Sequence, residues 1–133
     1  MEQKLRICIL NCWGAPLSKC INKRMKLIGK KFASETYDVI VLLEVFYQSS
    51  IDIIQALLSS SYPFSHYYIR FLIFLIFSGF IGSGIYIFSK YPLTDAFYTI
   101  YRTQGTPLDR TGDYYSNKGI AYCKLLLPDT EVK

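Results

Sequence analysis

Two apolar segments near the start of the chain have the pattern of strands. Residues 4–14 alternate weakly, are rich in Ile, Leu and Cys, and end at a Gly-Ala-Pro sequence. They predict a buried first strand that is followed by a loop. Residues 37–46 are apolar apart from one acid near each end, and they predict a second buried strand.

The segment between them, residues 18–35, has the spacing of an amphipathic helix. Apolar residues recur three to four positions apart and predict its buried face: Leu17, Ile21, Met25, Ile28 and Phe32. Lysines occupy the remaining faces: Lys19, Lys23, Lys26, Lys30 and Lys31. We expect Ser18 to cap this helix. We also expect the helix to cross over between two parallel strands.

A second, shorter helix is predicted over residues 49–62, where Ser49 with Asp52 resembles a capping box. After Pro63 the pattern changes to short aromatic segments, which predict strands: 64–69, 84–93, 96–102 and 119–128. A polar loop with turn residues, 103–118, separates the last two. Strands covered by helices on one side predict a layered α/β or α+β domain.

Composition narrows the class of protein. The length of 133 residues suits a single domain with a real core, and 51% hydrophobic with 17% aromatic residues excludes a disordered chain. The net charge of +5 suits a polyanionic or anionic-lipid partner without deciding between them. The helix lysines are accordingly interpreted either as a solvated face or as a contact with such a partner.

Four cysteines and one histidine, His66, do not have the spacing of a zinc site. The cysteines are interpreted as free thiols in a reduced, cytosolic environment. The first ten residues contain an acidic second residue and an apolar run that is too short for a signal peptide, so we expect none there.

Two polar residues occupy corresponding ends of the first two predicted strands. Glu44 follows the run Val39 to Leu43, where an unpaired carboxylate is costly to bury, and Asn11 has the same place on the first strand. Parallel strands would bring both side chains to one edge of the sheet. There Glu44 would hold a divalent metal, and Asn11 would orient the Glu44 carboxylate or donate to a phosphate oxygen. The alternatives are an acid that pairs with Lys or faces water, and an Asn that serves a turn.

A family resemblance is carried by four segments in this order: LRICILNCWG, DVIVLLEVF, SGFIGSGIYIFSKYPL and GDYYSNKGIAYCKL. Together they resemble the endonuclease/exonuclease/phosphatase superfamily, and more closely the neutral sphingomyelinases. The resemblance implies a partial, truncated two-layer α/β sandwich, with residues 1–133 as the amino-terminal part of a single domain. It also implies Mg²⁺-dependent hydrolysis of sphingomyelin, or a related phospholipid, to ceramide and phosphocholine at the cytoplasmic face of a membrane.

Site residues follow from the same resemblance. Asn11 and Glu44 match the metal-site residues of the family, and Asn11 is also expected to take part in catalysis. The block Gly112–Gly119 points to Lys118 as a basic catalytic residue near the phosphate, because a lysine is a good point-charge partner for a phosphoryl oxygen. The alternative for Lys118 is a solvent-facing loop lysine.

The chain departs from the family pattern in its later motifs. The Asn-x-His, Gly-Asp-x-Asn and Ser-Asp-His motifs, which supply the general base and most phosphate contacts, are absent. His66 lies upstream of the Gly-Ser-Gly block and does not replace the catalytic histidine. We therefore expect an incomplete chain with little activity alone. The alternatives are a non-catalytic membrane-associated or regulatory half-fold, and a nuclease of the same superfamily, although nucleic acid is the disfavoured partner.

A second departure is RFLIFLIF, residues 70–77, which stands before a Gly-rich bend at Gly79, Gly82 and Gly84. It fuses with its neighbours into an apolar window, 69–88, of about the length of a bilayer-spanning helix. Three interpretations stay open: a membrane helix, a strand extension or hydrophobic loop, and an insertion that is not a selected feature of the protein.

Overall fold

The computed structural model describes residues 4–69, 82–103 and 118–128 of the chain. Two helices and six strands follow one another in these residues: β1 (Ile7–Asn11), α1 (Ile21–Ala33), β2 (Val39–Leu43), α2 (Gln48–Leu58), β3 (Phe64–Tyr67), β4 (Tyr86–Ser89), β5 (Leu93–Ile100) and β6 (Gly119–Leu125).

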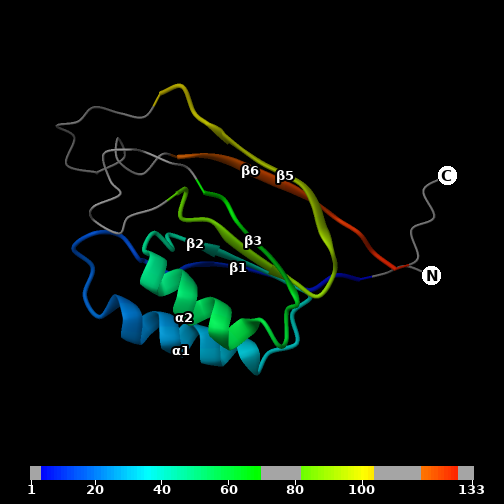
Figure 1. The fold of residues 1–133 in the computed structure, drawn as a ribbon, viewed down its shortest axis with the longest axis horizontal. Coiled ribbons are helices and arrows are strands. Elements are labelled where there is room, and N and C mark those ends of the chain that lie inside the picture. Colours follow the sequence, from blue (N-terminus) through cyan, green and yellow to red (C-terminus); the bar gives the residue numbers. More distant parts are fainter. Residues whose placement is uncertain (1–3, 70–81, 104–117, 129–133) are drawn as a thin grey trace.

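The strands form two sheets. Four of them pair in the order β1-β2-β4-β3, with β1 parallel to β2 and the other neighbours antiparallel. β5 and β6 form an antiparallel hairpin. Both helices cover one face of the four-stranded sheet, and the hairpin lies over the opposite face (Figure 1). This arrangement confirms the predicted α/β sandwich in partial form, with α1 as the crossover between parallel strands.

The main core lies between the helices and the four-stranded sheet. Its buried residues recur at helical spacing on the helices and at every second position on the strands: Met25, Phe32, Ile51, Ile54, Leu58, Ile40, Leu42, Tyr86 and Phe88. Each large side chain of this kind stabilises the fold by about 1.5–3 kcal/mol relative to exposure.

A smaller core joins the sheet to the hairpin. Val39, Tyr68 and Ile87 are buried there against residues of β5 and β6. The hydroxyl of Tyr68 donates to the backbone oxygen of Tyr122 at 2.8 Å. The hairpin is therefore held by both apolar burial and a hydrogen bond between the layers.

The prediction of a buried first strand is wrong. β1 lies at the edge of the four-stranded sheet, and Ile7 and Ile9 on one of its faces are 55% and 65% exposed. The reason is the position of the hairpin, which packs on Val39 of β2 and Ile87 of β4 and leaves the same face of β1 uncovered. β2, in contrast, is buried as predicted.

The start of α1 also differs from the prediction. The helix begins at Ile21, after Cys20 with a left-handed φ of 55°, and no side chain caps it. The Ser18 hydroxyl instead donates to the backbone oxygen of Ala15 at 2.8 Å. Leu17 therefore lies before the helix, fully exposed, and not on its buried face.

The predicted capping box of the second helix is absent for a similar reason. α2 begins at Gln48, so Ser49 lies inside the helix and not before it. The Ser49 hydroxyl hydrogen-bonds Oδ1 of Asn22 on α1 at 3.2 Å, and Asp52 accepts from the Gln48 side chain at 2.7 Å. Ser49 therefore joins α2 to α1, and Asp52 joins two successive turns of α2. Neither side chain caps the start of the helix.

The predictions for residues 70–77, Gly79 and most of the loop 103–118 lie outside the described residues. In the part of the chain that the structure describes, neither helix combines the length and apolar character that crossing a bilayer requires. The Gly-rich bend is confirmed for its other two members, because Gly82 and Gly84 have φ values of 66° and 75°.

Gly84 supports the turn that follows β2. Its backbone oxygen accepts from the Val45 amide at 2.9 Å. A Cβ at this position would lie 2.5 Å from Cε1 of the Phe46 ring. Both the positive φ and the close ring therefore require glycine.

We expect Gly84→Ala to lower the free energy of unfolding by about 3 kcal/mol, because the methyl group meets a rigid ring and the backbone conformation is unfavourable. Gly29→Ala is the matched control, since its methyl group comes nearest to Cδ1, the far end of the Leu57 side chain, and alanine favours the helix by about 1 kcal/mol. Urea unfolding measures both variants. Equal losses would contradict this account of Gly84.

Candidate functional site

Asn11 and Glu44 lie in contact at the carboxyl ends of two neighbouring parallel strands. Asn11 is the last residue of β1 and is in register with Leu43, the last residue of β2. Glu44 follows directly, and the Asn11 amide nitrogen donates to Glu44 Oε1 at 2.7 Å. The predicted juxtaposition of the two side chains is confirmed.

The Asn11 side chain is oriented by the chain that follows it. Its Oδ1 accepts from the backbone amide of Trp13 at 2.8 Å, so the amide nitrogen is directed at Glu44. A short Asn side chain makes this local turn readily, which explains why an Asn suits the end of β1. The amide therefore fits the predicted role of orienting the carboxylate.

The Glu44 backbone is confined from two sides. Its φ is 59°, a left-handed conformation that costs a non-glycine residue on the order of 1 kcal/mol. A Cβ on Gly14 would lie 2.1 Å from the Glu44 backbone oxygen, so only glycine fits there. On the other side, the Tyr67 hydroxyl donates to the Val45 backbone oxygen at 2.8 Å. The surrounding chain thus fixes the direction of the Glu44 side chain.

Glu44 is half-buried, and the one side-chain hydrogen bond of its carboxylate within the described residues is to Asn11. The ion pairs found in that same part of the chain involve other acids. The alternative of an acid neutralised by a lysine therefore gains no support from the described contacts. A carboxylate held in this way can accept a cation.

Cys12 directly follows Asn11, its backbone amide donates to the Leu43 backbone oxygen at 2.9 Å, and its side chain is buried. Burial raises the pKa of its thiol to about 12, the charge of Arg24 opposes this rise, and the charge of Glu44 adds to it. The thiol is therefore neutral at physiological pH. Cys12 packs in the main core next to the site.

The donor set fits magnesium better than a metal that needs several protein ligands. Among the described residues, no group of three His, Cys, Asp or Glu side chains lies close enough to hold a metal ion. Mg²⁺ keeps several waters and is commonly bound through one or two carboxylates together with a substrate phosphate. Glu44 as the direct ligand, oriented by Asn11, meets that requirement.

Lys118, the third predicted site residue, and His66 lie in different parts of the fold. Lys118 is exposed and precedes β6, which begins at the same end of the molecule at which β1 and β2 end (Figure 1). His66 lies on β3, which β2 and β4 separate from β1, and its ring packs against Tyr68 with centroids 4.6 Å apart. The structure therefore keeps His66 away from the Asn11–Glu44 contact, as the sequence suggested.

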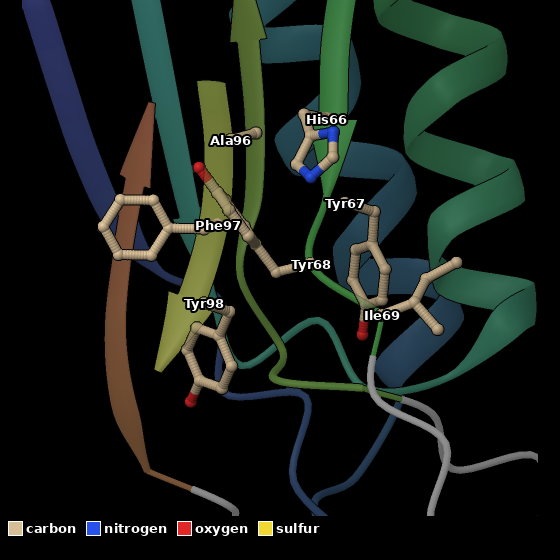
Figure 2. Close-up of a pocket in the computed structure, with 7 residues that line it drawn as sticks. All are labelled: His66, Tyr67, Tyr68, Ile69, Ala96, Phe97 and Tyr98. Carbon is tan, nitrogen blue, oxygen red and sulfur yellow. The ribbon is translucent and has the colours of Figure 1, made fainter. Parts of the chain in front are cut away.

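A hollow of about 480 Å³ lies between β3 and β5 (Figure 2). Its lining is mainly aromatic: His66, Tyr67, Tyr68, Ile69, Ala96, Phe97 and Tyr98. It contains neither Asn11 nor Glu44, and no carboxylate lines it, so it is distinct from the candidate site. The sequence did not reveal it, because its two walls come from different sheets.

Arg24 is a second feature that sequence reasoning missed. From the first turns of α1, its guanidinium donates to the backbone oxygens of Cys12 at 3.1 Å, Trp13 at 2.5 Å and Lys19 at 2.7 Å. The guanidinium carbon also lies 5.1 Å from the centroid of the Trp13 ring. A lone Arg among lysines was the available signal, since Arg alone offers this planar fork of donors.

Solved structures define the class of the fold. The chain superposes on a β-hairpin deletion mutant of beta toxin from Staphylococcus aureus with a TM-score of 0.74 at 22% identity, covering 96% of this chain and 48% of that one. Sphingomyelinase C from Streptomyces griseocarneus gives a TM-score of 0.67 at 20% identity, covering 95% and 46%. The fold is thus of the endonuclease/exonuclease/phosphatase type, in partial form.

Curated relatives define the sequence more narrowly, although no family model matches. The chain is 36% identical over 126 residues to Sphingomyelin phosphodiesterase 2 of Homo sapiens, covering 93% of this chain and 28% of that protein. It is 30% identical to Inositol phosphosphingolipids phospholipase C of Schizosaccharomyces pombe, covering 97% and 29%. The chain is therefore similar in sequence to these two proteins, and it spans less than a third of the length of either.

The Asn11–Glu44 contact can be tested by charge. We expect Asn11→Asp to lower the free energy of unfolding at pH 7 by about 1 kcal/mol, because two carboxylates would then face each other. The loss should be smaller near pH 4, because carboxyl groups bind protons at about that pH. It should also be smaller at pH 7 when Mg²⁺ is added, because the cation offsets the repulsion between the two carboxylates. Urea unfolding across this pH range measures the effect.

Asn11→Ala is the control, since it removes the hydrogen bond without adding a charge. Mg²⁺ should not reduce its loss of stability relative to the unchanged chain. A deficit in Asn11→Asp that is the same at both pH values and insensitive to the cation would contradict the contact.

Proposed function

We propose that this chain is part of a Mg²⁺-dependent phosphodiesterase that hydrolyses sphingomyelin to ceramide and phosphocholine. The observation that carries the proposal is the Asn11–Glu44 contact at the ends of parallel strands, in a chain similar to Sphingomyelin phosphodiesterase 2. A structure of a beta toxin variant with bound magnesium ions, which the chain matches with a TM-score of 0.71 at 22% identity, supports the choice of metal.

Three residues have distinct roles in this proposal. Glu44 holds the cation through its carboxylate, and Asn11 keeps that carboxylate oriented through the 2.7 Å hydrogen bond. Lys118 supplies a positive point charge for a phosphoryl oxygen. Bound Mg²⁺ would polarise the phosphodiester and stabilise the charge that develops on it.

Proton transfer requires a further group. Hydrolysis needs a general base within hydrogen-bond reach of the attacking water. The single histidine of the sequence, His66, lies on β3 with its ring against that of Tyr68, and it does not supply this base. We therefore expect this chain alone to bind the metal and lipid surface while turning over little substrate.

The partner surface in this proposal is a membrane, at its cytoplasmic face. The free cysteines support the reducing compartment, and the net charge of +5 supports an anionic lipid surface. A non-catalytic membrane-associated half-fold is the second candidate, and the position of His66 favours it. A nuclease is the third, and the same net charge favours it.

Metal binding is the first test. Titration calorimetry with MgCl₂ should detect binding to the 133-residue chain and none to Glu44→Gln, because an amide lacks the carboxylate charge. Asn11→Ala should weaken binding about tenfold, since it removes the group that orients the ligand. Glu35→Gln is the matched control, because Glu35 pairs with Lys31 on α1 at 2.6 Å and should leave binding intact.

The substrate is the second test. Phosphocholine release from sphingomyelin vesicles and nicking of plasmid DNA are measured with the chain in excess over substrate, with Mg²⁺ or with EDTA. We expect slow, Mg²⁺-dependent phosphocholine release that Glu44→Gln abolishes. DNA cleavage without phosphocholine release would favour the nuclease, and Mg²⁺ binding without either reaction would favour the non-catalytic half-fold.

A further inference from the structure

The loop between β1 and α1 presents two large apolar side chains to solvent. Trp13 is 61% exposed and Leu17 is 101% exposed. Both have left-handed backbone conformations, with φ values of 50° and 74°. Leaving such side chains in water forgoes most of the stabilisation that burial would give them, so their exposure is a cost unless a partner covers them.

The exposure is built into the loop. Arg24 on α1 donates to the backbone oxygens of Trp13 and Lys19, near the two ends of the loop, and lies against the Trp13 ring. The Ser18 hydroxyl closes the turn onto Ala15 at 2.8 Å. These contacts hold the backbone while the Trp13 and Leu17 side chains point outward.

The charged residues of the loop and of α1 have one sign. Every charged residue between Gly14 and Ser34 is a lysine or an arginine. Five lysines are exposed there, Lys19 in the loop and Lys23, Lys26, Lys30 and Lys31 on α1, and Lys31 also pairs with Glu35 at 2.6 Å. Tryptophan and leucine next to lysines match the headgroup region of an anionic bilayer, where rings and acyl chains meet water and phosphate.

The loop is also next to the candidate site. It begins one residue after Asn11, at the end of the sheet where Glu44 lies, and the loop and the start of α1 are at that same end (Figure 1). A surface that binds the loop would therefore face the Asn11–Glu44 contact. A protein partner would not require the loop and the Asn11–Glu44 contact to lie at the same end of the sheet, whereas a lipid substrate would.

We propose that the β1–α1 loop is an interfacial anchor that inserts Trp13 and Leu17 into the headgroup region of an anionic lipid bilayer. The exposed lysines of α1 attract the anionic surface, and Arg24 is a positioning residue for the loop. The choice of lipid as the partner rests on the proposed function. The anchor itself requires neither Mg²⁺ nor turnover.

Trp13 is the single tryptophan of the sequence, so its fluorescence reports on this loop alone. The 133-residue chain is titrated with vesicles of phosphatidylcholine and phosphatidylserine in equal amounts, in the presence of EDTA. We expect the emission to shift to shorter wavelength and to be quenched by lipids brominated on their acyl chains. Added salt should weaken the binding, because it screens the lysines.

Leu17→Ser should lower vesicle affinity about tenfold, because the loop then loses the burial of one leucine side chain. Leu126→Ser is the matched control. Leu126 is also an exposed leucine, at 50%, but it follows β6, whose carboxyl end lies at the opposite end of the sheets from the loop (Figure 1). The vesicle affinity of Leu126→Ser should equal that of the unchanged chain. Leu17 makes no packing contact as a fully exposed residue, so its variant should fold normally.

Three outcomes would overturn the anchor: no shift of Trp13 emission with vesicles, an equal loss of affinity in Leu17→Ser and Leu126→Ser, or a shift with DNA duplexes and none with vesicles. Glu44→Gln separates this inference from the proposed function. It should bind vesicles as the unchanged chain does while losing Mg²⁺. If the unchanged chain binds vesicles but does not bind Mg²⁺, the result counts against the proposed enzyme and supports the anchor.

Discussion

Parallel pairing of β1 with β2 is the constraint on which the candidate site depends. It places the ends of two strands side by side and joins Asn11 to Glu44 across 33 positions of sequence. The pairing in turn depends on α1, because parallel neighbours need a crossover that returns the chain to the same end of the sheet. The buried face of α1, with Met25 and Phe32 against the sheet, therefore supports the site although it lies away from it.

Glu44 shows how this fold directs a polar side chain. Its left-handed backbone is unfavourable by itself, and it persists because Gly14 admits the Glu44 backbone oxygen and Gly84 anchors the next residue. Strained conformations of this kind commonly mark functional positions. Here the conformation turns the chain away from the strand direction at the point where β2 ends, so the carboxylate meets the amide of the neighbouring strand.

The sequence predicted those features that have a period or a fixed geometry. The 3.6-residue spacing of Met25 and Phe32 identified α1, and the parallel arrangement of two apolar runs placed Asn11 beside Glu44. The prediction from sequence failed where burial depends on a segment that is distant in the sequence. Ile9 is exposed because the hairpin covers β2 and β4 instead of β1, and no pattern within β1 contains that information. The Ser18 cap failed because left-handed φ values at Leu17 and Cys20 shorten α1 at its start, and an ordinary residue gives no sign of such a conformation. The capping box failed because α2 begins at Gln48, one residue before Ser49.

The edge position of β1 connects the extension of the sheet to the candidate site. An edge strand offers a row of backbone N–H and C=O groups on its outer side, and on β1 this row ends at Asn11. A further strand that pairs with β1 and has one end level with Asn11 would place a terminal residue beside Asn11. Extension of the sheet and completion of the surroundings of Asn11 would then be a single event.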